Sequence, residues 1–311
     1  MSAPSLLAGV DVGGTKIAVG LAAQDGRIVA SRRARTSPAG GDQVVQEIAA
    51  LLADVLEESG TARESLAAIG IAVPAVTDRE RGVVLWAPNI AGWQEEIAVA
   101  GPVSEALGAP ASLHYDGHAW VAGEWWCGAA RGAQNVVLVA VGTGIGGGVI
   151  LDGRLHRGRV GVAGAIGWWL PDWRQAGEAR SASQGWLESA ASGPAIARAA
   201  GKATAEEAFA AARAGDAAAR HAVVQAGQVL GAAAANLVSL LDPELVVFAG
   251  GVIAGGADLL LPRIREIVAR EAQPQISRDV RIAAAELGDD AAWLGAARLA
   301  LDHSASAEEV T

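Results

Sequence analysis

The sequence predicts an α/β protein built from two related domains. Short apolar strands alternate with helix-like segments along its 311 residues, which is typical of α/β folds. Two segments, "GVDVGGTKIAVGL" (9–21) and "VAVGTGIGGGVIL" (139–151), each run from a strand through a glycine turn directly into a second strand. This approximate internal duplication predicts two domains that face each other across a cleft. We expect domains at 1–117 and 118–288, with a helix at 289–302 as a candidate to rejoin the first.

Turn residues and helical spacing separate the elements expected in the first domain. The Asp25-Gly26 pair is a strong hairpin signal and predicts two strands within 16–35. A helix is expected over 41–58, because apolar residues recur there at helical spacing, namely Val44, Ile48, Leu51, Leu52 and Val55. Further strands are expected at 6–14, 66–74, 82–88 and 111–115.

The second domain is expected to be mostly helical around a few strands. A helix-like stretch at 117–130 precedes strands at 135–141, 146–155 and 244–251, and a helix covers 289–301. Residues 222–241 carry no charge and are long enough to span a membrane. Polar side chains recur through them, at Gln225, Gln228, Asn236 and Ser239. We therefore expect a buried helix of a soluble domain and no membrane partner.

Charge and cysteine content narrow the function class. The formal net charge is −10, which argues against binding a phosphate backbone, so no nucleic-acid partner is expected. The single cysteine, Cys127, excludes an intrachain disulfide and a cysteine-built metal site. It also fits a reducing compartment. The N-terminus lacks a basic leader and no signal peptide is expected, which together indicate a cytoplasmic protein.

The first glycine turn, "DVGGTK" (11–16), has the composition of a phosphate-binding loop. Gly13 and Gly14 let backbone N–H groups approach phosphate oxygens, and the Thr15 hydroxyl can add a hydrogen bond. Asp11 can hold a hydrated Mg²⁺, whose protein ligands are usually one or two carboxylates. The alternative is a plain hairpin turn, although no turn type requires both the Asp and Lys16.

Two further glycine turns extend the candidate nucleotide site. "GTGIGG" (142–147) formally matches the dinucleotide fingerprint, but that fingerprint requires a helix after the glycines and a strand follows here. We interpret the turn as a second phosphate grip, with Gly142, Thr143 and Gly144 as its candidates. A third turn follows a buried strand at Gly250 and Gly251, where adenine or ribose could lie against the backbone.

These three turns, with an Asp near the domain junction, resemble the actin–hexokinase superfamily. Within it, "GVDVGGTKIAVGL", "APNIAGW", "GEWWCGAARGAQNVVLVAVGTGIGGGVILDGRLHRG" and "ELVVFAGGV" are similar to the landmarks of the ROK family of bacterial sugar kinases and related repressors. The resemblance covers about residues 7 to 300. It implies a two-domain actin/hexokinase-like (ribonuclease H-like) fold with an interdomain cleft. It also implies a homodimer that uses ATP and Mg²⁺ to phosphorylate a sugar.

The resemblance assigns roles to further residues. Asp116 in "YDGH" (115–118) takes the position of the catalytic base, where a carboxylate can accept the hydroxyl proton. The alternative is that Asp116 caps the helix that follows, and capping can coexist with catalysis. The candidate substrate-binding residues are Asn89, Tyr115, Asp116, His118, Ala165, Trp168 and Glu188.

Several of these positions depart from the family pattern. Ala165 and Trp168 in "AGAIGW" (163–168) replace a Glu and a His that bind sugar in the family's glucose kinases, and Tyr115 replaces an Asn. Glu188 is kept, but the stretch around it (179–189) lacks the family's zinc-binding cysteines, so no zinc is expected. A site that loses hydrogen-bonding partners discriminates poorly for the hydroxyls it once held. Glucose is therefore expected to bind poorly.

The leading hypothesis is a kinase that transfers the γ-phosphoryl group of ATP to a hydroxyl of a sugar-like molecule, with a primary, 6-position-like hydroxyl favoured. An amino sugar, a deoxy sugar or a carbocyclic cyclitol would fit the altered positions. Tryptophan faces can stack on sugar rings, and Trp168 is expected to line the pocket. The alternatives are a catalytically silent sugar-binding pseudo-kinase and a sugar-sensing repressor. Only about six residues precede the first strand, which disfavours the repressor.

Overall fold

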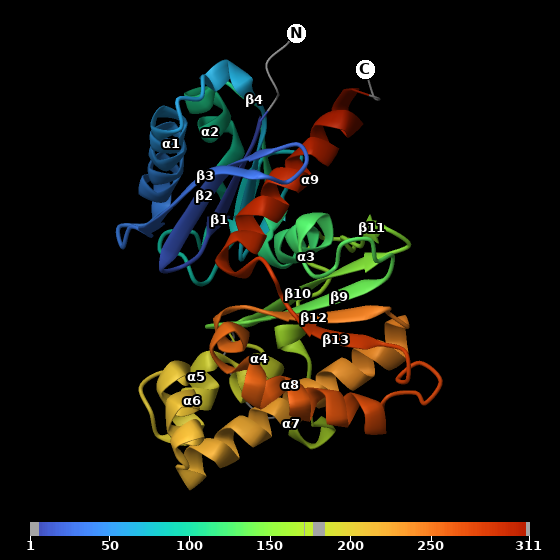
Figure 1. The fold of residues 1–311 in the computed structure, drawn as a ribbon. Coiled ribbons are helices and arrows are strands. Elements are labelled where there is room, and N and C mark those ends of the chain that lie inside the picture. The colour runs from blue at the N-terminus through green and yellow to red at the C-terminus, as the bar shows by residue number, and fades with distance from the viewer. Residues whose placement is uncertain (1–5, 171, 177–183, 309–311) are drawn as a thin grey trace. The chain divides into compact units, whose positions relative to one another are not determined.

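The computed structural model describes residues 6–170, 172–176 and 184–308, and these form two compact α/β units (Figure 1). The first unit contains the chain up to Gly128, Arg157–Ala163 and the chain from Asp290 onward. The second contains Ala129–His156 and Gly164–Asp289. The predicted mixed α/β fold is confirmed. The domain boundary placed at residues 117 and 118 stays a prediction.

The first unit is built on a five-stranded sheet in the order β3-β2-β1-β4-β8. Its central strands are buried and consist largely of aliphatic residues, as expected for strands covered on both faces. β1 pairs with β2 antiparallel and with β4 parallel, and β4 pairs with β8 parallel. The strands are β1 (Leu6–Val12), β2 (Lys16–Ala23), β3 (Ile28–Arg35), β4 (Leu66–Val73) and β8 (Ala111–Tyr115).

The hairpin and the helix predicted from short sequence patterns in this unit are both present in the structure. Gly26 adopts a φ of 87° between β2 and β3, so the predicted hairpin turn is confirmed. Helix α1 (Gly41–Glu58) buries Val44 and Ile48, as its apolar spacing predicted. The strand expected at 82–88 is shorter, and it pairs in a separate three-stranded sheet. The remaining elements are β5 (Val76–Asp78), β6 (Val83–Trp86), β7 (Ile97–Ala98), α2 (Ala100–Leu107), α3 (Asp116–Cys127) and the 3₁₀ helix η1 (Arg63–Ser65).

The second unit repeats the topology of the first. Its sheet has the order β11-β10-β9-β12-β13, with the same sequence of antiparallel and parallel pairings. The internal duplication inferred from the two glycine turns is therefore confirmed at the level of strand order. The strands are β9 (Val136–Val141), β10 (Ile145–Leu151), β11 (Arg154–Leu155), β12 (Leu245–Ala249) and β13 (Arg281–Ala284).

Helices provide most of the core of the second unit. α7 (Ala217–Leu241) contains the uncharged window and is long and apolar enough to cross a membrane by length and composition, but 56% of its most apolar window is buried. Its buried residues belong to the core that also contains Val246 and Phe248 of β12, as predicted. The other helices are α4 (Trp186–Ala191), α5 (Gly193–Ala200), α6 (Ala205–Ala214), α8 (Gly251–Glu271) and the 3₁₀ helices η2 (Ile166–Trp168), η3 (Trp173–Gln175) and η4 (Gly288–Asp290).

The last helix, α9 (Ala291–Glu308), packs on the sheet of the first unit. Its Ala297 and Ala300 form a buried cluster with Leu7 of β1 and Ala68 of β4. The backbone of α9 comes close to strands β1 and β4 because each strand has a glycine, Gly9 and Gly70, beneath the helix. A methyl group at Gly9 would overlap the carbonyl oxygen of Trp293, and one at Gly70 would overlap that of Ala296.

Candidate active site

Two carboxylates meet at one edge of the sheet in the first unit. Asp11 lies near the carboxyl end of β1, and Asp116 follows β8 as the first residue of α3. Because β1, β4 and β8 are parallel, their carboxyl ends share an edge, where ligands bind in open α/β sheets. Burial, and next the negative charge of Asp11, raise the pKa of Asp116 to about 7. A carboxylate with this pKa is suited to accept a proton near neutral pH.

The helix start holds Asp116 in place. The side chain is partly buried, and its Oδ1 accepts a hydrogen bond of 2.8 Å from the backbone N–H of Gly117. It is not the N-cap of α3, since Tyr115 occupies that place. The predicted capping alternative is therefore not the arrangement observed, while the catalytic role stays a prediction.

The first glycine turn lies next to the same edge. Gly13 donates a 2.8 Å hydrogen bond to Lys16 O and accepts one of 2.7 Å from Thr36 Oγ1. Gly14, Thr15 and Lys16 are exposed. A methyl group at Gly14 would overlap the backbone carbonyl of Asn89, so the turn and the exposed Asn89 are neighbours. One predicted phosphate candidate, Gly14, and one predicted substrate candidate, Asn89, are therefore neighbours.

Tyr115 and His118 flank the candidate base from both sides in sequence. Their rings make an edge-on contact with centroids 5.2 Å apart. His118 is buried, and its Nε2 lies 3.0 Å from the carbonyl oxygen of Ala163, to which it donates when Nε2 carries the proton. The side chain at this predicted substrate position thus also holds the 157–163 segment against α3.

The second glycine turn is held from two sides in the second unit. Gly142 donates to Gly144 O across the turn (2.9 Å) and accepts from the N–H of Gly193 (2.8 Å). The N–H of Ile145 donates to Glu188 Oε2 (2.9 Å). Thr143 lies inside this turn and is exposed. Two predicted candidates, Gly144 and Glu188, are therefore in direct contact.

The third turn begins a helix. Gly250, with a φ of 88°, joins β12 to α8, and Gly251 is the first residue of that helix. Backbone N–H groups at a helix N-terminus favour anions. Apart from the glycine itself, its two chain neighbours and the nearby backbone of its own helix, no atom of the described residues lies within 4 Å of where a Cβ would stand at Gly142 or Gly251. This open space at two candidate glycines fits a nucleotide lying against the backbone.

The altered segment lies beside Glu188. Ala165 directly precedes η2, and Trp168 ends that turn with 42% of its surface exposed. A methyl group at Gly167 would lie 3.6 Å from Glu188 Cβ. Trp169 accepts a 3.0 Å hydrogen bond from the N–H of Leu187, next to Glu188. Ala165, Trp168 and Glu188 thus lie in one part of the second unit.

Few side chains in the described part of the chain are placed to bind a metal ion together. Within the described residues, no group of three or more His, Cys, Asp and Glu side chains is arranged to hold a metal ion. Asp11, with Asp116 nearby, fits the one or two carboxylates with which proteins hold a phosphate-bound Mg²⁺. The stretch used to predict the lack of zinc lies partly outside the described residues, which omit 177–183.

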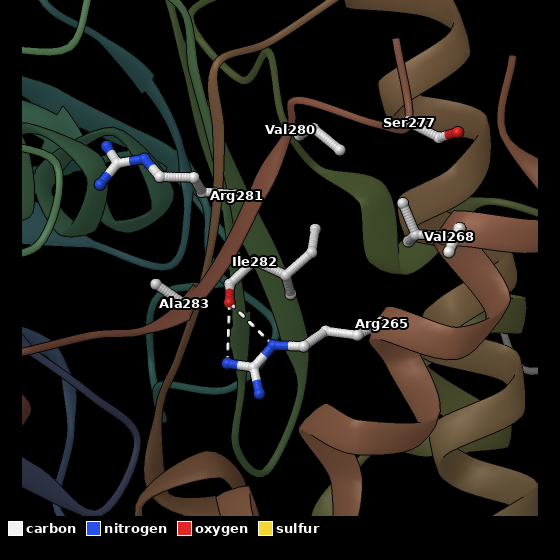
Figure 2. A pocket seen from close by; sticks show the side chains of 8 residues that line it. Arg265, Val268, Ser277, Val280, Arg281, Ile282 and Ala283 are labelled. Atoms are coloured by element: carbon white, nitrogen blue, oxygen red, sulfur yellow. Dashed lines mark hydrogen bonds between the residues drawn. The ribbon is translucent and has the colours of Figure 1, made fainter. Parts of the chain in front are cut away.

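Sequence reasoning missed one contact of the site and one hollow elsewhere in the second unit. One is Gly193, which contacts the second turn; its signal was the "SGP" start of a helix, because Pro is favoured in the first turn. The other is a hollow of about 510 Å³ between α8 and the edge strand β13 (Figure 2). There Arg265 donates from Nε and Nη2 to Ile282 O. None of the predicted site residues lines this hollow.

Comparisons with known proteins agree on one family. The ROK family pattern matches residues 7–303. The chain is 33% identical over 316 residues to a glucokinase of Thermotoga maritima, covering 94% of this chain and 96% of that protein. It is 37% identical over 299 residues to the bifunctional enzyme NanE/NanK of Brucella melitensis, covering 93% of this chain and 53% of that protein.

The fold agrees as well. A crystal structure of a ROK family glucokinase from Streptomyces griseus, in complex with glucose and AMPPNP, has 33% sequence identity and a TM-score of 0.80. The likeness covers 96% of this chain and 100% of that one. The actin/hexokinase-like fold implied by the sequence motifs is therefore confirmed, and the chain belongs to the ROK family.

Proposed function

We propose that this protein is an ATP-dependent sugar kinase that phosphorylates a hydroxyl of a sugar-like acceptor other than plain glucose. The observation that carries the proposal is the pair of carboxylates at the sheet edge. Burial, and next the charge of Asp11, raise the pKa of Asp116 to about 7, at the position to which the sequence resemblance assigns the base. The family relationship supports the reaction class, and the altered side chains support the change of acceptor.

The nucleotide is expected to be held mainly by backbone. In the first unit, the exposed Gly14 and Thr15 offer N–H groups and a hydroxyl to phosphate oxygens. In the second, the Gly142 turn and the start of α8 at Gly251 border open space beside backbone. Mg²⁺, when bound with ATP, would be held by Asp11 and would neutralise charge on the phosphates.

Asp116 is expected to move the proton of the reaction. The acceptor O–H gives its proton to the Asp116 carboxylate while its oxygen forms a bond to the γ-phosphorus. The bond from that phosphorus to the β–γ bridging oxygen breaks, and ADP leaves with the electron pair. The Gly117 N–H donates to Oδ1 of Asp116, so Oδ2 is the oxygen expected to take the proton. A positioned base of this kind contributes about 10²–10⁴-fold to the rate.

The acceptor is expected to differ from glucose, because Ala165 and Trp168 in the second unit, and Tyr115 in the first, replace residues that bind sugar in the family's glucose kinases. Alanine offers no hydrogen bond where the family's glucose kinases have a carboxylate, and Trp168 presents an aromatic surface with 42% exposure. An acceptor ring that has fewer hydroxyls, an amino group or a carbocyclic frame would lose fewer hydrogen bonds at these positions than glucose does. A primary, 6-position-like hydroxyl remains the favoured phosphoryl acceptor, because the base position is kept.

The decisive experiment measures ADP release from ATP and Mg²⁺ with a panel of sugars, amino sugars, deoxy sugars and cyclitols. We expect at least one acceptor to accelerate release, with glucose poor. Asp116→Asn should abolish that activity, while Glu105→Gln, which removes an exposed charge from α2 of the same unit, should leave it intact. If no acceptor works, the pseudo-kinase alternative holds; if Asp116→Asn stays active, this base is wrong.

Two further proposals concern assembly and location. The single Cys127 fits a cytoplasmic protein, and the family resemblance suggests a homodimer. Light scattering on the purified chain tests the second statement, since a monomer at micromolar concentration would contradict it.

A further inference from the structure

Glu188 of α4 and Gly193, the first residue of α5, hold the two ends of the second glycine turn. The turn runs from Gly142 to Ile145. At its start, Gly142 O accepts a 2.8 Å hydrogen bond from Gly193 N. At its end, Ile145 N donates a 2.9 Å hydrogen bond to Glu188 Oε2. Both partners belong to one six-residue stretch, 188–193, so the turn and this stretch form a closed unit.

Glu188 contributes the side-chain half of this grip. Its carboxylate is partly buried, and the backbone N–H of Ile145 is its donor among the described residues. A hydrogen bond to a charged acceptor is about twice as strong as a neutral one. A Cβ at Gly144 would lie 2.5 Å from Oε2. The glycine at this position is therefore what lets the carboxylate reach the turn.

The same side chain lies beside the segment that is proposed to line the acceptor site, because a Cβ at Gly167 would lie 3.6 Å from Glu188 Cβ. Hydrogen bonds that the structure gives to Glu188 use Oε2, and no described residue donates to Oε1. Backbone contacts tie the neighbouring Leu187 to Trp169 at 3.0 Å, directly after the exposed Trp168. One carboxylate can therefore contact an acceptor hydroxyl through Oε1 and the nucleotide turn through Oε2.

We propose that Glu188 is a positioning residue for the nucleotide turn, and that through it acceptor binding and nucleotide binding strengthen each other. This rests on the proposed function, which places a nucleotide at Gly142–Gly144 and an acceptor at Glu188. A hydroxyl at Oε1 holds the carboxylate in the orientation that fixes Ile145 N. The turn then has less freedom to lose when phosphate binds, so nucleotide affinity rises.

The test is nucleotide binding without turnover. Isothermal titration calorimetry with AMPPNP and Mg²⁺, and no acceptor, compares the parent with Glu188→Ala and Glu188→Gln. Glu188→Ala should bind AMPPNP with about tenfold lower affinity, because it loses one charge-assisted hydrogen bond. Glu188→Gln keeps an oxygen that can accept from Ile145 N, so its AMPPNP affinity should stay within about threefold of the parent's. Glu206→Ala, an exposed acid on α6 of the same unit, is the control and should bind as the parent does.

Each outcome has a separate meaning. If the parent binds AMPPNP and Glu188→Ala binds it equally well, the positioning role is wrong. If glutamine is as weak as alanine, the hydrogen bond to Ile145 is not what matters, and the proposal also fails. If the parent binds no nucleotide, the proposed function itself fails.

A second variant covers the case in which Glu188→Ala unfolds. Gly144→Ala pushes the carboxylate off the turn without removing it, and should weaken AMPPNP similarly while thermal unfolding shows a folded protein. In the parent, an active acceptor from the panel should tighten AMPPNP, and Glu188→Gln should remove most of that gain. Unchanged AMPPNP affinity in Gly144→Ala, or an undiminished acceptor effect in Glu188→Gln, would overturn the coupling.

Discussion

Replacing Asp116 by asparagine is expected to stabilise the protein above neutral pH while it removes activity. The folded state raises the pKa of Asp116 from 3.8 to about 7, through burial and the charge of Asp11. Below about pH 4 the carboxyl is protonated in both states, so the variant and the parent should match. As the pH rises towards 7, the unfolded chain releases this proton first, and the parent loses stability. Above pH 7 the full cost of the buried charge is present.

The size of the effect follows from the pKa. A shift of about three units corresponds to at most about 4 kcal/mol. The Asp116 side chain is only partly buried, so solvent screens its charge, and we expect about 1–2 kcal/mol. For a unit of this size that is a rise of about 2–8 °C in the melting temperature at pH 8. Asparagine keeps an oxygen that can accept the Gly117 N–H bond, which limits side effects on α3.

The assay is scanning calorimetry at pH 4.5, 6, 7 and 8, without nucleotide and with a chelator, because Mg²⁺ at Asp11 would offset the repulsion. Glu105→Gln serves as the matched control, since it removes one exposed charge in the same unit. Its melting temperature should follow the parent's at every pH. The reasoning is refuted if Asp116→Asn melts at or below the parent at pH 8. It is also refuted if its advantage is as large at pH 4.5.

Three other predictions address the base, the acceptor pocket and the packing of the last helix. Turnover with the best acceptor should fall as the pH is lowered through about 7, because Asp116 must be ionised to accept the proton; a flat profile from pH 6 to 8 would contradict this. Ala165→Glu combined with Trp168→His should raise kcat/KM for glucose, and no change in steady-state kinetics would show that these positions do not face the sugar. Gly70→Ala should destabilise the fold by about 2 kcal/mol or more in urea unfolding, because its methyl group would overlap the backbone of α9. Gly101→Ala, with open space around it in α2, should be neutral or stabilising, and an equal loss in both variants would rule out helix packing as the cause.

Much of the fold could be predicted because its signals are local. The strand–glycine turn–strand segments ending at Leu21 and Leu151 each gave a correct antiparallel pair. The Asp25-Gly26 pair marked a real hairpin. Such signals depend on the backbone preferences of a few adjacent residues, so one sequence suffices to find them. The strand at 82–88 was placed well, but its partners in a separate sheet could not be read from it.

Motifs can name candidate residues of a site one by one, but they do not give the arrangement of those residues. Motifs named Asp11, Asp116 and Glu188, whose roles remain predictions. That Asp11 raises the pKa of Asp116 depends on the pairing of β1 and β8 with β4, which brings together residues about one hundred positions apart. The bond between Glu188 and Ile145 likewise depends on where α4 packs. Long-range pairing of this kind leaves no mark in the local sequence.

The packing of α9 on the first sheet has a consequence for the order of events during synthesis. β1 leaves the ribosome long before α9, yet Leu7 and Ala68 are covered by residues near position 300. The second unit ends at Asp289, so its chain is complete before that cover exists. β1 and β4 must therefore wait, with these apolar residues uncovered, until the chain has been synthesised through α9. A nascent chain stalled before α9 is expected to be a chaperone client through its N-terminal half, because exposed apolar strands of this kind are prone to aggregate.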